Sequence, residues 1–138
     1  MQPNFVGEWS GPDGMYETRL GAERLRLNNP YRKLLDNGIK IAFGSDGMPF
    51  NPIYGLWSAV NHYIKESKIS LVEAVKGFGL DAAYSSFEEK VKGSVEPGKL
   101  ADITILSKDL TTMKSERIMD AKVDLTLVGG KPLYKRTA

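Results

Sequence analysis

The chain has 138 residues and a mass of 15.3 kDa, a length that suits one domain with its own hydrophobic core. Its 19 basic and 17 acidic residues are interspersed and give a net charge of only +2, which does not indicate nucleic-acid binding. Cysteine is absent, which excludes disulfides, Cys-ligated metals and thiol catalysis, and no apolar stretch reaches the roughly 18 residues of a membrane helix. The N-terminus carries no secretory signal pattern, so we expect a cytoplasmic protein without a membrane partner.

The first forty residues predict a loop followed by two helices. Glycines and Pro12 interrupt residues 1–18, which predicts a loop. Residues 17–28 then follow a helical pattern, with Leu20, Arg24 and Leu27 on one side. A second helix is expected from Pro30, with Asn29 as its N-cap and a glycine after its end.

The middle of the chain predicts one strand and further helices. Residues 39–43 are almost entirely apolar, as in a strand buried on both faces. Apolar residues at helical spacing follow over 53–64. Ser70 and Glu73 form a capping box that opens another helix, and residues 80–89 continue it or start a second one.

From Gly93 onward the pattern changes to strands. Residues 102–106 predict a strand, and residues 123–128 alternate between apolar and polar. Gly129 and Gly130 are suited to a two-residue hairpin turn, with Tyr134 on the returning strand. The whole pattern is that of an α/β protein up to about residue 92 and a mainly β segment thereafter.

Asp46 is the first candidate for chemistry, because it follows the predicted strand directly. Open α/β sheets and barrels place their sites at the carboxyl ends of strands, where a carboxylate can bind a metal or act as a base. The alternative is structural, with Ser45 or Asp46 capping the next helix or anchoring the turn. The residue pattern leaves both interpretations open.

His62 is the single histidine in the chain. It lies nine residues past Ile53, which at about 100° per residue places it half a turn from the apolar stripe, so we expect a surface histidine. No HxH, HExxH or CxxC pattern accompanies it.

Residues 93–100, "GSVEPGKL", share their spacing with the start of a nucleotide-binding P-loop. Leu100 stands where Ser or Thr would ligate magnesium, and the segment precedes a strand instead of following one. Pro97 also lacks the N–H that could hold phosphate. A turn is therefore favoured over a nucleotide site.

The glycine-rich N-terminal segment carries aromatic and charged side chains, among them Trp9 and Arg19. Such residues on a long loop can bind a substrate, and they can equally be ordinary surface residues. The sequence does not separate these two interpretations.

Several segments, taken in order, resemble the C-terminal part of the amidohydrolase superfamily, in the branch that includes N-acyl and formamide hydrolases. The resemblance covers essentially all 138 residues, and its individual motifs are specific only in combination. The segments are "MQPNF", "RLGAER", "NPYRKLLDNGIKIAFGSDGMPFNPIYGLWSAV", "ISLVEAV", "GSVEPGKLADITILSKDL" and "VDLTLVGGKPLY".

The resemblance implies a fold and a site. It implies that residues 1–92 are the last two βα units of a TIM-like barrel and that residues 93–138 are strands of a small composite β-sandwich domain. Asp46 corresponds to the family's carboxylate that ligates a catalytic divalent metal, usually zinc, and accepts a proton from the metal-bound water. Barrel loops after the strands line the substrate pocket. The residues expected to line it here are Gln2, Trp9, Arg19 and Met48.

The family's other metal ligands have no counterpart in this sequence. They are a His-x-His pair, a lysine or glutamate, and two further histidines, all on strands before the seventh, whereas the resemblance begins at the seventh. We therefore expect a part of a hydrolase of small amide-type compounds that binds no metal and is inactive by itself. The alternative is a non-catalytic fragment, from an internal start or a split gene, that self-associates or complements the upstream barrel half, because its sheet edges are unpaired.

Overall fold

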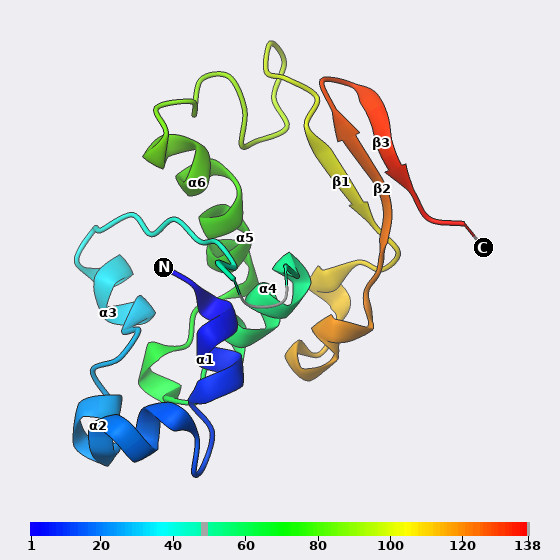
Figure 1. Ribbon diagram of the computed structural model, residues 1–138. Helices are drawn as coiled ribbons and strands as arrows, with labels where there is room; N and C mark the ends of the chain where they lie inside the picture. Colours follow the sequence, from blue (N-terminus) through cyan, green and yellow to red (C-terminus); the bar gives the residue numbers. More distant parts are fainter. Residues whose placement is uncertain (48–49, 138) are drawn as a thin grey trace.

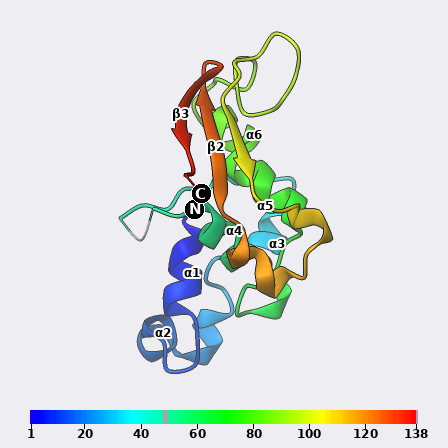
Figure 2. The same ribbon diagram turned by 90° about the vertical axis from the view of Figure 1, so that its right-hand side faces the viewer.

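The computed structural model describes residues 1–47 and 50–137 (Figure 1). Helices and a small sheet form two neighbouring parts, with β1 the strand nearest to α5 and α6 in both views (Figures 1 and 2). The helices are α1 (Pro3–Trp9), α2 (Met15–Leu25), α3 (Tyr31–Asp36), α4 (Pro52–Val60), α5 (Leu71–Phe78) and α6 (Leu80–Ser85). The strands are β1 (Ile103–Leu106), β2 (Val123–Val128) and β3 (Lys131–Lys135), and the 3₁₀ turns are η1 (Lys65–Ser67), η2 (Leu110–Thr112) and η3 (Ser115–Asp120).

The predicted loop over residues 1–18 is wrong, because most of α1 and the start of α2 lie within it. Pro3 occupies the first turn of α1, and Val6 is buried. Gly7 lets α1 approach α4 closely, since a Cβ there would lie 2.3 Å from the Ser58 hydroxyl oxygen. A helix of this length is unstable alone, so its packing against α4 stabilises it in spite of the glycine.

The predicted helix over 17–28 is confirmed in part. It spans Met15–Leu25 and is broken at Gly21, whose φ is 74°. Leu25 is buried, whereas Leu27 lies beyond the end of the helix and is 69% exposed, so the helix is shorter than predicted and buries a different leucine. Asn29 is also not an N-cap, since it adopts a φ of 51° and Pro30 precedes α3.

The segment from Ile39 to Phe43 is extended but joins no sheet in the described part of the chain. The prediction of a strand buried on both faces is wrong, because burial alternates: Ile41 and Phe43 are buried, whereas Lys40 is exposed and Ala42 only partly buried. In the described part of the chain, Met1 bonds to Ala42 and Gly44 and the helical residue Gly77 accepts from Phe43, so no strand ladder develops.

The next helices confirm most of the predicted pattern, although α4 ends at Val60 and not at residue 64. Ser70 and Glu73 form the expected capping box at the start of α5. Gly79 separates α5 from α6, so residues 80–85 form a helix of their own. Asn51 caps α4 by accepting hydrogen bonds from the amides of Ile53 and Tyr54 at 3.1 and 3.2 Å.

The C-terminal part is a three-stranded antiparallel sheet of order β1-β2-β3, as its sequence pattern predicts. Gly129 and Gly130 both have positive φ, 55° and 78°, which suits the two-residue turn of a twisted hairpin. The amide of Gly129 donates to the Asp102 carboxylate at 2.7 Å, which holds this turn against the start of β1.

The core lies between the helices and the connection from β1 to β2. Asn61 ties these parts together, because its side-chain amide donates to the carbonyl of Ser115 in η3 at 3.0 Å. The core cluster consists of Val6, Tyr31, Ile41, Phe43, Leu56, Ala59, Ile69, Ala74, Leu110, Ile118 and Ala121.

Candidate functional site

Asp46 lies just beyond the extended segment, beside the start of the chain. The Met1 amino group donates to the Ala42 carbonyl at 2.6 Å, and the Met1 carbonyl accepts from the Gly44 amide at 3.1 Å. Met1 thus bonds to the two residues that flank Phe43, which is the pattern of a parallel β-bridge. The chain start and the segment that leads to Asp46 therefore run side by side in the same direction.

Asp46 itself is exposed and adopts a φ of 54°, which is uncommon for a residue other than glycine. Its carboxylate accepts a hydrogen bond from the Gly47 amide at 2.6 Å. This bond fits the turn-anchoring interpretation, whereas the idea that Ser45 or Asp46 caps the next helix is wrong, because Asn51 is that cap. Within residues 1–47 and 50–137, Gly47 is the one hydrogen-bond donor to this carboxylate, so the group keeps capacity for a ligand or a proton.

The residues expected to line the pocket lie at two places. Gln2 precedes α1 and adjoins the Met1 bridge, so it lies near the segment leading to Asp46. Trp9 ends α1, about 10 Å further along the axis, and stacks on Phe5 with ring centroids 4.6 Å apart. Arg19 is exposed on α2. Met48 lies outside the described residues.

The described residues do not form a complete metal site. Within residues 1–47 and 50–137, no three His, Asp or Glu side chains gather where they could hold a metal ion. A catalytic zinc ordinarily takes three protein ligands, so Asp46 does not fit such an ion without further ligands.

His62 is buried, with 2% of its surface exposed, so the prediction of a surface histidine is wrong. Helix α4 ends at Val60, and the helical spacing therefore does not extend to His62. Its Nδ1 accepts from the Ile64 amide at 2.9 Å, and its ring meets the Tyr31 ring edge to face at 5.3 Å. Burial lowers the pKa of His62 to about 4, which keeps it neutral and makes it part of the core.

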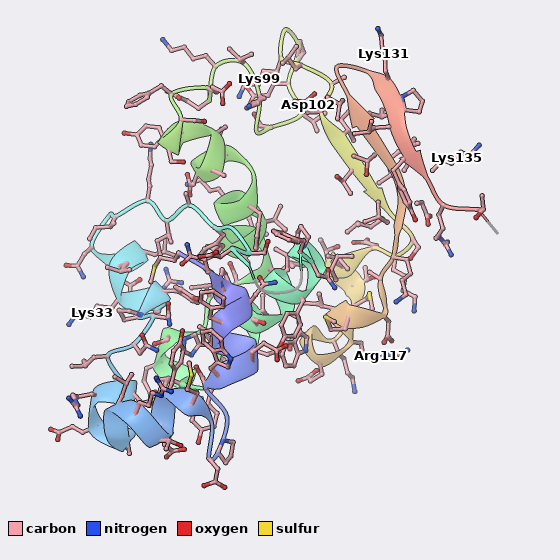
Figure 3. All side chains as sticks on the ribbon, viewed as in Figure 1. Lys33, Lys99, Asp102, Arg117, Lys131 and Lys135 are labelled. Atoms are coloured by element: carbon pink, nitrogen blue, oxygen red, sulfur yellow. The ribbon has the colours of Figure 1, made fainter. Side chains whose placement is uncertain are left out.

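Residues 93–100 form turns, as the sequence favours. The Lys99 ammonium pairs with the Glu96 carboxylate at 3.2 Å and also donates to the Ser94 hydroxyl. Figure 3 shows Lys99 and Asp102 at the same end of the sheet, where β1 and not a helix follows. The side chain that would hold phosphate in a P-loop is therefore occupied within the turn.

The sequence profile of the amidohydrolase family (Amidohydro_3) matches residues 1–134. The chain belongs to the amidohydrolase family. Its sequence corresponds to the C-terminal part of the superfamily's members. An amidohydrolase from Thermotoga maritima has a similar structure, with a TM-score of 0.57 and 25% identity over 75% of this chain and 25% of that one.

Several proteins are similar in sequence to this amidohydrolase chain. Protein LONG AFTER FAR-RED 3 of Arabidopsis thaliana is 33% identical over 84% of the chain, and the putative amidohydrolase YtcJ of Bacillus subtilis is 28% identical over 99%. An N-substituted formamide deformylase of Arthrobacter pascens is 27% identical over 83%. The matched regions make up 22%, 28% and 23% of these relatives, so the chain spans about a quarter of their length. Relatives named as deformylase, imidazolonepropionase and deaminase act on carbon–nitrogen bonds.

Sequence reasoning missed two asparagines that form hydrogen bonds near the segment of Asp46, namely Asn4 and Asn51. Asn51 could have been found, because an asparagine before proline at the start of an apolar helical pattern is an N-cap signal. Asn4 carries no such signal, since its burial depends on how α1 packs against α4.

No helix in the described ranges is long and apolar enough to cross a membrane.

Proposed function

We propose that this chain forms the C-terminal part of a metal-dependent hydrolase that acts on non-peptide carbon–nitrogen bonds. In this proposal residues 1–92 belong to a TIM-like barrel and residues 93–138 to a composite β-sandwich. The observation that carries it is the placement of Asp46 at the end of a segment that pairs with Met1 in the parallel manner. Parallel barrel strands present their functional side chains at this end.

The role we assign to Asp46 is that of one ligand and proton acceptor in a larger site. The remaining ligands must come from outside the described residues, because these hold no metal-binding cluster. A divalent ion such as zinc, when bound, would lower the pKa of a water molecule. This chain contributes an exposed carboxylate whose backbone is fixed by the turn at Gly47.

The test uses the assembled hydrolase, in which this sequence is combined with the segment that supplies the other ligands. Asp46→Asn should lower kcat for an N-substituted formamide by about 10²- to 10⁴-fold, as expected for the loss of a proton acceptor. Asp13→Asn is the matched control, because Asp13 is also exposed and also has a positive φ, 59°. Activity of Asp46→Asn close to that of the Asp13→Asn control would overturn the proposal.

The same proposal makes the isolated chain inactive. After incubation with zinc and dialysis, it should retain far less than one metal ion per chain and should not hydrolyse formamides. Stoichiometric zinc, measured by atomic emission, would contradict the assignment of the other ligands to a different segment.

A second candidate function is association with further polypeptide through the sheet. Ile105 lies opposite Leu125 and is 46% exposed, and Leu133 on β3 is 75% exposed. Exposed apolar side chains on a three-stranded sheet favour a partner. Leu133→Glu should reduce self-association in sedimentation velocity experiments, whereas Lys131→Glu on the same strand should not. A monomeric wild-type chain at all concentrations would exclude self-association.

A further inference from the structure

Asn4 is a polar residue in a place where an apolar side chain would ordinarily pack. It lies on α1 and has no exposed surface. Gly55 leaves room for it, since a Cβ at Gly55 would come within 2.6 Å of the Asn4 side-chain oxygen and 2.4 Å of the Phe78 ring. Burying an amide costs free energy unless hydrogen bonds replace those to water, so its contacts indicate what the residue does.

The Asn4 side-chain amide donates to the Asn51 carbonyl at 3.2 Å. Asn51 is extended, and its own side chain caps α4 through the Ile53 and Tyr54 amides. The backbone of Asn51 is thus held on one side by α1 and on the other by the helix it opens. This residue marks the end of the connection that carries Asp46.

The start of that connection is held by the same N-terminal segment. The Met1 carbonyl accepts from Gly44, two residues before Asp46, and Met1 donates to Ala42. Residues 1–4 therefore bond to both ends of the connection between Gly44 and Asn51. Because α1 packs beside α4 in both views, these bonds join the two anchors to the same pair of packed helices (Figures 1 and 2).

We propose that Asn4 is a positioning residue, which fixes the backbone of Asn51 and thereby the orientation of the Asp46 carboxylate. The catalytic part of this inference rests on the proposed function of Asp46. The structural part rests on the hydrogen bonds alone. Catalytic groups need placement within a fraction of an ångström, and buried hydrogen bonds from a helix provide it better than a free loop does.

The structural test uses the chain as it is and compares Asn4→Asp with Asn61→Asp. Asn61 is a matched control, because its side-chain amide also donates to backbone carbonyls, those of Trp57 and Ser115 at 3.0 Å, far along the chain from Asp46. In Asn4→Asp, hydrogen exchange of the Ile53 and Tyr54 amides should rise about tenfold, as for the loss of one hydrogen bond. The NMR order parameter of the Gly47 amide should fall relative to wild type, whereas Asn61→Asp should leave both unchanged at matched global stability.

Asn4→Ser provides a second variant in case Asn4→Asp does not fold, since serine retains a donor but is too short to reach Asn51. The inference would be overturned if the folded variant kept the wild-type hydrogen exchange at Ile53 and Tyr54 and the wild-type order parameter at Gly47. Equal changes in the Asn61 control would overturn it as well. In the assembled hydrolase, Asn4→Ser should lower kcat with little change in KM. If Asp46→Asn left hydrolysis intact, the proposed function of Asp46 would be wrong. The hydrogen-exchange data would still decide the role of Asn4.

Discussion

Arg32 on α3 holds both carboxylate oxygens of Glu73 on α5, with nitrogen–oxygen distances of 2.8 and 3.0 Å. The same carboxylate accepts from the backbone amide of Ser70, so one side chain serves both the capping box and the contact between helices. The hydrogen bond from Arg32 is the main reason that the pKa of Glu73 falls to about 2.

Glu73→Gln should separate these two roles, because glutamine can still complete a capping box but cannot form the ion pair. We expect the free energy of unfolding to fall by about 1 to 2 kcal/mol at pH 7. Urea denaturation measures this loss, and Glu88→Gln, which removes only the exposed pair with Lys92, should change the midpoint much less. Equal losses in the two variants would contradict the structural role of the Arg32 contact.

The depressed pKa of Glu73 also predicts a dependence on acid. The carboxylate is charged in the folded state down to about pH 2, whereas in the unfolded state it binds a proton near 4.5. Its contribution is therefore complete above pH 4.5 and is lost as the pH falls from there to about 2. Wild-type stability should decrease more steeply over this window than that of Glu73→Gln.

His62 predicts a second acid transition at higher pH. Its pKa is about 4 in the folded state and 6.5 when unperturbed, so the unfolded chain binds more protons between these values. Stability should therefore fall by up to about 3 kcal/mol as the pH drops from 6.5 to 4. His62→Asn, which keeps an acceptor for the Ile64 amide, should flatten this part of the profile in denaturation experiments. An unchanged slope in that variant would show that His62 titrates normally.

Gly77 predicts a steric effect beneath the segment that leads to Asp46. A Cβ at this position would lie 2.5 Å from the Phe43 ring, and the Gly77 carbonyl accepts from the Phe43 amide at 2.9 Å. Gly77→Ala should therefore destabilise the fold by about 1 to 3 kcal/mol, although alanine favours the helix. Gly11→Ala is the control, since nothing lies within 4 Å of a Cβ there. Thermal unfolding compares the two variants, and a gain in stability for Gly77→Ala would refute the close contact.

Much of the local structure could be predicted because its causes are local. The capping box of Ser70 and Glu73 and the Gly129-Gly130 hairpin depend on residues within a few positions of one another. The placement of Asp46 after an extended segment, and the family to which the chain belongs, also follow from sequence order. The two structural interpretations of Asp46 were distinguished only by the bond to Gly47 and the cap at Asn51.

The sequence by itself determined the hairpin, the capping box, the family and the residue at the end of the extended segment. Only the tertiary structure decided that residues 3–9 form a helix, that His62 is buried and that Asn4 bonds to Asn51. These features depend on contacts between residues up to 51 positions apart, such as Gly7 against Ser58 on α4. Local patterns carry no information about such contacts. Helix formation in so short a segment as α1, and burial of polar side chains, follow from the packing that surrounds them.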